Sequence, residues 1–85
     1  KAMQDQAPLY ARKIDVVGYS GSNIDIIELK PRAGLSTLGQ VKGYVELYKR
    51  DIKPATAPRA VIITDEILQD MVELAKKEGV RIIAV

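Results

Sequence analysis

Two β-branched runs separated by four turn residues constrain the fold of this chain more than any other feature. The runs are KIDVVGY (13–19) and IDIIELK (24–30), and the segment between them, SGSN (20–23), has typical turn chemistry. So short a connection permits only antiparallel pairing, because parallel strands need a crossover of a dozen or more residues. We therefore expect a β-hairpin whose second strand ends at Pro31, since PRAG (31–34) is typical of a loop.

The remainder of the chain alternates between helical and strand patterns. In order, the patterns predict a helix over 36–52, a linker with two prolines over 53–58, a strand over 59–64, an amphipathic helix over 65–79 that ends at Gly79, and a strand over 80–85. Residues 1–11 predict a loosely ordered start with a short strand near Leu9–Ala11. A strand–helix–strand order favours parallel pairing, so we expect one α/β domain over 1–85 with a mixed β-sheet flanked by helices.

Composition excludes several classes of site. The chain of 85 residues has no Cys and no His, which excludes disulfides, thiol catalysis, zinc sites built from Cys or His, and triads that use His. A metal site would therefore use Asp and Glu oxygens, which favour hard cations such as Mg²⁺, Ca²⁺ or Mn²⁺. The net charge of +2 is too small to indicate nucleic acid by itself. No apolar run is long enough to span a membrane, and the absence of Cys fits a cytoplasmic location.

The register of the hairpin brings two acidic residues together. A two-residue turn at Gly21–Ser22 sets a ladder in which Asp15 lies opposite Glu28. Cross-strand neighbours have Cβ atoms about 4.5–5.5 Å apart, and Lys30 shares the face of Glu28 because side chains alternate along a strand. Opposed carboxylates repel each other unless a cation neutralises them. The patch is therefore a candidate site for a divalent metal beside a lysine that stabilises an anion.

Simpler interpretations of these residues remain open at this point. A hairpin loop of three or five residues would move Asp15 to the other face of the sheet. Even in the expected register, Glu28 and Lys30 at an exposed strand end could form no more than a surface ion pair, which contributes roughly 0–1 kcal/mol. Asp25 falls on the opposite face, where we interpret it as a structural or edge residue.

Gln40 is a polar residue on the apolar side of the helix predicted over 36–52. At about 100° per residue it falls between Leu47 and Tyr44, whereas the charged side chains gather on the opposite side. A polar group within an apolar arc needs a hydrogen-bond partner. Gln40 either completes a capping box with Thr37 as the N-cap, or it points toward the acidic residues of the hairpin, and both can hold together.

Taken together, these residues resemble a known nuclease superfamily. ID at Ile14–Asp15, ELK at Glu28–Lys30 and GQVKGYVELY at Gly39–Tyr48 resemble the PD-(D/E)xK nucleases, and within them the RecB-like and mismatch-endonuclease branch. The resemblance covers about 12–85. One part departs from the family pattern, because Arg12–Lys13 occupies the Gly-Arg position in shifted form.

The resemblance implies a restriction-endonuclease-like core of β-hairpin, helix, strand, helix and strand. The branch usually has an N-terminal helix with an acidic residue, which residues 1–11 are too short to hold, so we expect that helix to be missing or truncated. The resemblance also assigns roles to six residues: Asp15, Glu28 and the backbone carbonyl of Leu29 as ligands of Mg²⁺ (or Mn²⁺), Lys30 and Gln40 as catalytic groups that act with the carboxylates on water and phosphate, and Tyr44 as a support of the same face.

We therefore expect a metal-dependent endonuclease of the DNA repair or restriction type, with DNA as its partner. The basic residues expected to contact DNA phosphates, each of which also serves as a solubilising group, are Arg12, Lys13, Arg32 and Lys42. Tyr10 and Tyr19 are candidates for stacking on a base, although core or edge packing also explains them.

A function of a different class is a catalytically incomplete nuclease-fold module that binds nucleic acid or a protein partner without cutting. The chain begins with Lys rather than Met, so it is either a piece of a longer protein, whose other domains are then possible partners, or a trimmed chain. A homodimer is a further expectation, because a second subunit would cover the sheet of so small a fold.

Overall fold

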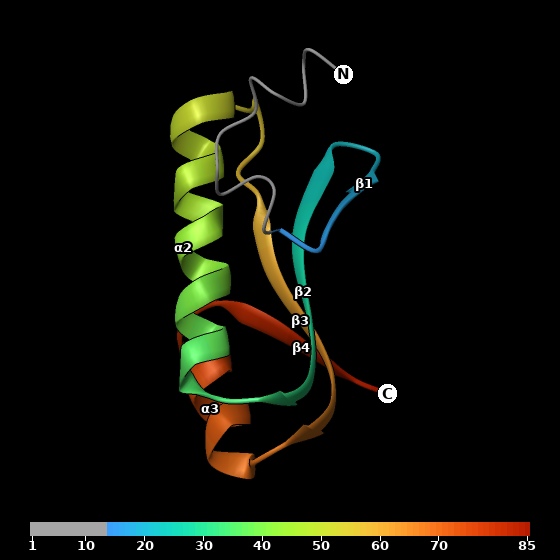
Figure 1. Cartoon of the computed structure of the whole chain (residues 1–85). Helices are drawn as coiled ribbons and strands as arrows, with labels where there is room; N and C mark the ends of the chain where they lie inside the picture. Colours follow the sequence, from blue (N-terminus) through green and yellow to red (C-terminus); the bar gives the residue numbers. More distant parts are fainter. Residues whose placement is uncertain (1–13) are drawn as a thin grey trace.

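A four-stranded sheet and two helices form the part of the chain that the computed structural model describes, residues 14–85 (Figure 1). The elements are β1 (Val16–Ser20), β2 (Asn23–Ala33), α2 (Leu35–Ile52), β3 (Arg59–Ile67), α3 (Gln69–Lys77) and β4 (Val80–Ala84). The strand order is β1-β2-β3-β4, with β1 antiparallel to β2 and the other two pairs parallel. The predicted mixed sheet is therefore confirmed.

Two expectations concern a part of the chain outside the described residues. These are the short strand near Leu9–Ala11 and the truncation of an N-terminal helix. Within residues 14–85, neither helix combines the length and the apolar character needed to cross a membrane.

The hairpin has the predicted register. Ser20 pairs with Asn23 across a two-residue turn. Gly21 has a φ of +60°, the left-handed value that a type II′ turn requires of its first central residue and that glycine adopts without a Cβ penalty. Loops of three or five residues, which would have turned Asp15 to the other face, are thereby excluded.

β2 does not end at Pro31, as the sequence predicted, but continues to Ala33. Ile27 pairs with the first residue of β1, and beyond it β3 alone pairs with β2 among the described residues. Proline is tolerated on such an edge, because its missing N–H need not deprive a neighbouring strand of a hydrogen bond. Arg32 pairs with Glu66 of β3, so the expected loop is part of the sheet.

β3 is correspondingly longer, and α3 shorter, than predicted. The helix expected over 65–79 begins at Gln69, and the residues before it extend β3 to Ile67. The extension is stabilised by pairing with β2 and by an ion pair in which the Arg32 Nε lies 2.8 Å from the Glu66 Oε1. Helical spacing within the segment carries no information about a strand partner that lies far away in the sequence.

The N-terminal cap of α2 differs from the predicted one. Gly34 is the N-cap, and Thr37, which was expected there, is the third residue of the helix. The buried Thr37 hydroxyl accepts a hydrogen bond from the Gly34 backbone N–H at 3.4 Å, which is one half of a capping box. Gln40 lies beyond the capping position, so the capping explanation of Gln40 is wrong.

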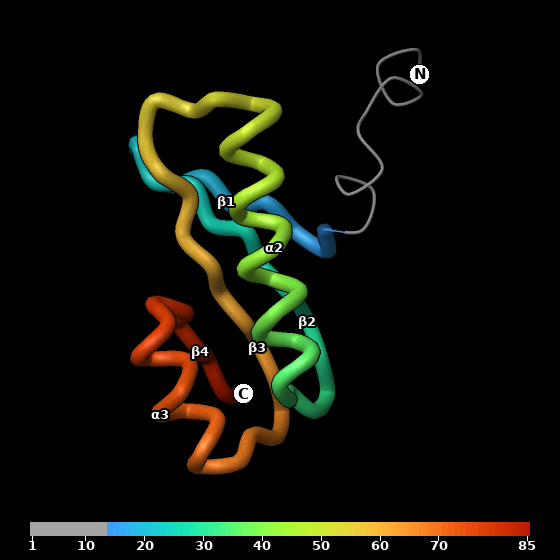
Figure 2. Tube along the Cα trace, turned by 90° about the vertical axis from the view of Figure 1, so that its left-hand side faces the viewer, coloured from blue at the N-terminus to red at the C-terminus, as the bar shows by residue number. Residues whose placement is uncertain are grey.

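Both helices pack on the same face of the sheet (Figures 1 and 2). Ile26, Ile62 and Val80 of the sheet form one buried cluster with Val41 of α2 and Ala75 of α3. The sequence predicted a sheet flanked by helices without assigning them to one face or to both. The crossovers through α2 and α3 advance in the same direction across the sheet, and two right-handed crossovers of this kind place their helices on one side.

Substitution by alanine should change the free energy of unfolding in opposite directions at two glycines. Gly79 follows α3 with a φ of +76°, Gly43 lies within α2, and an added Cβ would meet nothing within 4 Å at either position. Gly79→Ala should lower the free energy of unfolding by about 1–2 kcal/mol, because the left-handed region disfavours L-residues. Gly43→Ala should raise it by about 0.8–1 kcal/mol, because alanine has the higher helix propensity. Urea unfolding followed by circular dichroism measures both, and effects of equal sign would contradict these backbone conformations.

Candidate functional site

The two acidic residues of the hairpin lie on the face of the sheet that the helices cover. Side chains alternate along β2, so Glu28 shares this face with the core residue Ile26. Asp15, just before β1, lies alongside β2, and its Oδ2 accepts a hydrogen bond from the Leu29 backbone N–H at 2.9 Å. The structure thus brings Asp15 and Glu28, the acidic pair, together as the register predicted.

Glu28 is a buried carboxyl group with an incomplete set of partners. It is 5% exposed, and its Oε1 has no hydrogen-bond partner among residues 14–85. Its Oε2 lies 3.8 Å from the Lys30 Nζ, too far for a hydrogen bond. Burial and, secondly, the negative charge of Asp15 raise the pKa of Glu28, while Lys30 acts in the opposite direction. Because an unpartnered buried carboxylate is costly, the site favours a cation or a proton at Glu28.

The donor atoms at this site suit a hard divalent cation. The acidic pair and the nearby backbone carbonyl of Leu29 offer the oxygen ligands that Mg²⁺ and Mn²⁺ prefer, and Glu28 Oε1 is without another partner in the described part of the chain. No group of three or more acidic side chains gathers anywhere within residues 14–85. Mg²⁺ usually keeps several waters and takes one or two carboxylates, so the residues present fit this ion.

Two tyrosines connect the hairpin to α2. The hydroxyl oxygens of Tyr19 on β1 and Tyr48 on α2 are 3.2 Å apart, at hydrogen-bond distance. Sequence analysis missed this tether, although two signals point to it. Strand alternation puts Tyr19 on the face of Asp15, and helical spacing puts Tyr48 on the flank of α2 that carries Gln40 and the half-buried Tyr44.

The tyrosine tether joins β1, the strand that follows Asp15, to the flank of α2 that carries Gln40. α2 runs opposite to β2 and therefore in the direction of β1 (Figure 1). From Tyr48 back to Gln40 is ~12 Å of helix, and from Tyr19 back to Asp15 is ~13 Å of strand. Gln40 therefore lies on the flank of α2 that carries Tyr48, and Asp15 on the face of the hairpin that carries Tyr19.

Gln40 does not lie inside the apolar arc of α2, where the sequence placed it. It is exposed, because the buried side of the helix centres on Val41 and Val45. Within residues 14–85, no hydrogen bond joins the Gln40 amide to the acidic pair. The role of Gln40 at the acidic pair stays a prediction.

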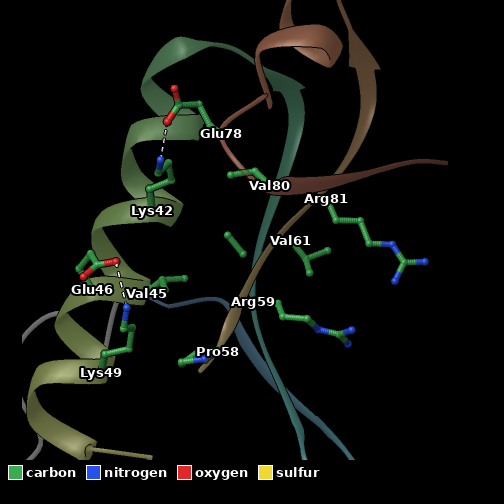
Figure 3. A pocket seen from close by; sticks show the side chains of 12 residues that line it. Lys42, Val45, Glu46, Lys49, Pro58, Arg59, Val61, Glu78, Val80 and Arg81 are labelled. Carbon is green, nitrogen blue, oxygen red and sulfur yellow. Dashed lines mark hydrogen bonds and ion pairs between the residues drawn. The ribbon is translucent and has the colours of Figure 1, made fainter. Parts of the chain in front are cut away.

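The basic residues expected to contact DNA do not form one cluster. Arg32 shares the face of the acidic pair near the end of β2, and its guanidinium pairs with Glu66. Lys42 lies on the other flank of α2, where its ammonium pairs with Glu78 at 2.5 Å (Figure 3). The remaining two, Arg12 and Lys13, lie outside the described residues.

Lys42 lines a cavity of about 390 Å³ that is separate from the acidic pair. The cavity lies between α2, the turn from α3 to β4, and the starts of β3 and β4. Figure 3 shows Lys42 on the helix, while the side chains of Arg59 and Arg81 extend away from it. The structure therefore does not bring Lys42 to the candidate site.

Asp25 lies on the opposite face of β2 and has a structural partner. Its two carboxylate oxygens accept hydrogen bonds from the Arg59 Nε at 2.7 Å and Nη2 at 3.1 Å. The pairing joins β2 to the first residue of β3. The structural interpretation of Asp25 is confirmed.

Comparisons with known proteins give a consistent result. A family model described as "Endonuclease NucS C-terminal domain" matches residues 9–85. Among solved structures, the chain is similar to "crystal structure of a repair endonuclease from Pyrococcus abyssi", with 27% sequence identity and a TM-score of 0.71. This match covers 85% of the chain but 32% of the solved one, so it corresponds to the smaller part of that protein. No curated protein matched significantly.

The buried Glu28 should make the protein less stable as pH rises in metal-free buffer. Because its pKa in the folded protein is raised above the ordinary value of 4.5, the folded state holds the proton more tightly than the unfolded state. The contribution of Glu28 to the free energy of unfolding therefore falls as pH rises from about 4.5 through the raised pKa. Glu28→Gln removes this term and should be more stable than the wild type at pH 7.

Thermal unfolding in EDTA between pH 4 and pH 8 measures the difference. The advantage of Glu28→Gln should vanish toward pH 4, where the wild-type carboxyl is protonated in both states. A variant that is no more stable at pH 7, or equally more stable at every pH, would contradict the burial of an ionisable carboxyl at this position. Asp25→Asn, on the other face of the same strand, is the control for removing a carboxylate.

Proposed function

Because the chain belongs to the family of endonuclease NucS C-terminal domains, we propose that it is a metal-dependent nuclease domain that hydrolyses phosphodiester bonds of DNA. The observation that carries the proposal is the buried, unpartnered Glu28 oxygen beside Asp15 and Lys30. A carboxyl with a raised pKa, a charge partner and no hydrogen bond is typical of a working site rather than of a packed core. We assign the site to the PD-(D/E)xK type.

Asp15, Glu28 and the backbone carbonyl of Leu29 would hold Mg²⁺ or Mn²⁺. When bound there, the ion lowers the pKa of a water molecule and offsets charge that develops on the phosphate. Asp15 is positioned by its hydrogen bond from the Leu29 N–H, which aims the carboxylate across the strand pair. Glu28 is positioned by burial, because the surrounding core leaves its side chain few alternative conformations.

Lys30 would place a positive charge at the scissile phosphate. Its side chain is 42% exposed and shares the face of Glu28, so its ammonium can reach a ligand in solvent while remaining near the acidic pair. There it stabilises the attacking water or the charge of the transition state. Gln40 would orient the water or a phosphate oxygen through its amide, and Tyr44 would support that flank of α2.

Among the basic residues, Arg32 is the one we assign to the DNA backbone. Its side chain is 86% exposed, and it lies two residues beyond Lys30 on the same face of β2. Phosphate can compete for its guanidinium, because a solvent-exposed ion pair with Glu66 is worth little. Lys42 would contact DNA only from the other flank of α2.

Cleavage of labelled DNA with and without Mg²⁺ tests the proposal. Glu28→Gln and Lys30→Ala should each lower the cleavage rate by about 100-fold or more, the effect of removing one preorganised charge from a phosphoryl-transfer site. Asp25→Asn is the matched control on the opposite face and should cut at the wild-type rate. Thermal midpoints of all variants establish that they are folded.

The result that would overturn the assignment is undiminished cleavage by both site variants, or cleavage that persists in EDTA. The alternative is a module of the same fold that binds nucleic acid or a protein partner without cutting. It is favoured by one observation, that no third acidic side chain from residues 14–85 joins the acidic pair. The alternative predicts no cleavage with Mg²⁺ or Mn²⁺ and a DNA affinity that is indifferent to Glu28→Gln.

A further inference from the structure

Thr64 is a buried polar residue that the proposed reaction does not use. It is 1% exposed and lies on the face of β3 that the helices cover, two residues beyond the core residue Ile62. Burying a hydroxyl costs free energy unless the group makes hydrogen bonds. The hydrogen-bond partners of Thr64 therefore indicate what this residue does.

The Thr64 hydroxyl joins the end of β2 to the end of β3. Its Oγ1 lies 3.2 Å from the Pro31 carbonyl oxygen and 3.1 Å from the Glu66 carbonyl oxygen, and the hydroxyl donates to these two acceptors. The two carbonyls share one hydroxyl proton. The same Oγ1 accepts a hydrogen bond from the Glu66 backbone N–H at 3.3 Å. One side chain thus holds three backbone groups of two strands.

These hydrogen bonds lie at a gap in the pairing of β2 with β3. Lys30 pairs with Thr64 and Arg32 pairs with Glu66, but Pro31, which lies between them, has no partner in this register. Among the described residues, β2 also has no strand on its other side at this point. Figure 1 shows that the end of β2 bends toward the start of α2. The Thr64 hydroxyl therefore restrains a strand end that has little other support.

Lys30 lies directly beside this restraint. It pairs with Thr64 in the register of β2 and β3, and neighbouring strands are about 4.8 Å apart. Pro31, whose carbonyl the Thr64 hydroxyl holds, is the next residue along the chain. A shift of the Pro31 peptide group would displace the backbone of Lys30, and with it the ammonium group that lies 3.8 Å from Glu28 Oε2.

We propose that Thr64 is a positioning residue for Lys30. Its hydroxyl fixes the end of β2 and so holds the Lys30 ammonium beside the acidic pair in the geometry that cleavage needs. The inference rests on the proposed nuclease function, and it deepens that function by naming a residue that acts on the reaction without touching the substrate. A misplacement of a catalytic group by about 1 Å can lower a rate about 100-fold.

Single-turnover cleavage of labelled DNA with Mg²⁺ measures the effect of the hydroxyl. Thr64→Val keeps the shape of the side chain and should lower the maximal rate by about 10- to 100-fold. Thr64→Ser keeps the hydroxyl and should cut at nearly the wild-type rate, although the lost methyl group lowers its thermal midpoint. Thr64→Ala differs from Thr64→Ser by the hydroxyl alone and should cut about 10- to 100-fold more slowly than it. If Thr64→Val does not fold, this second pair decides.

Two comparisons separate positioning from a general loss of stability. Thr37→Val removes another buried hydroxyl that bonds to the backbone, at the start of α2, and should lower the thermal midpoint while the rate stays at the wild-type value. In a Lys30→Ala background, Thr64→Val should lower the rate no further, because the group that Thr64 positions is absent.

Four results of these cleavage experiments would overturn the inference. One is a folded Thr64→Val that cuts at the wild-type rate, and another is an equal rate for Thr64→Ser and Thr64→Ala. The third is a loss in Thr37→Val as large as in Thr64→Val, which would assign the effect to stability. The fourth is an additive loss in the Lys30→Ala background, which would mean that Thr64 does not act through Lys30.

Amide hydrogen exchange without DNA or metal tests the restraint independently of cleavage. Relative to the Ile26 amide in the middle of β2, the Arg32 amide should exchange faster in Thr64→Val than in Thr64→Ser. The same relative rate in both variants would contradict the restraint.

The two proposals can therefore fail separately. If the wild type does not cut DNA, the nuclease assignment fails, and the exchange of Arg32 still decides whether the hydroxyl holds the end of β2. If the wild type and a folded Thr64→Val cut equally well, the positioning role alone fails.

Discussion

The pairing of β2 with a different partner on each side is the constraint on which the rest of the structure depends. Antiparallel pairing with β1 fixes the register of β2 and therefore which of its side chains face the helices. Parallel pairing with β3 covers the other edge of β2. A slip of one residue would turn Glu28 and Lys30 to the open face and bring Ile27 and Leu29 under the helices. The hydrophobic core and the acidic pair therefore both depend on the register of β1 and β2, and a change of register would disrupt both.

Local patterns in the sequence predicted the order of the elements and the hairpin register correctly. Both depend on neighbouring residues, namely the turn chemistry around Gly21 and the alternation along the two strands. The ends of β2 and β3 were predicted wrongly, because Pro31 indicates a stop only in a strand with neighbours on both sides. The extension to Ile67 arises from pairing between segments that are distant in the sequence. The placement of both helices on one face follows from crossover handedness once the strand order is known.

The candidate site was predictable to the same extent and for the same reasons. Asp15 and Glu28 follow from the register alone, and Lys30 from alternation. The exposure of Gln40 depends on how α2 packs on the sheet, which involves segments that no local pattern connects. Glu28 is also the residue that a stability argument would remove first, since it is buried, ionisable and incompletely partnered. Such exceptions to good packing are expected where a protein binds a ligand.

The tyrosine tether has a consequence for how this domain tolerates changes in length. The Tyr19–Tyr48 contact links β1 to α2, so a residue inserted on one side alone changes the spacing of Asp15 or of Gln40 from this contact. One extra residue in the strand reverses the face of Asp15, and one in the helix turns Gln40 by about 100°. Two added residues in the strand, ~6.6 Å, keep the face of Asp15, and four in the helix, ~6 Å, return Gln40 to within about 40° of its direction. Insertions in β1 and in α2 are therefore coupled: a change of length in one element calls for a matching change in the other.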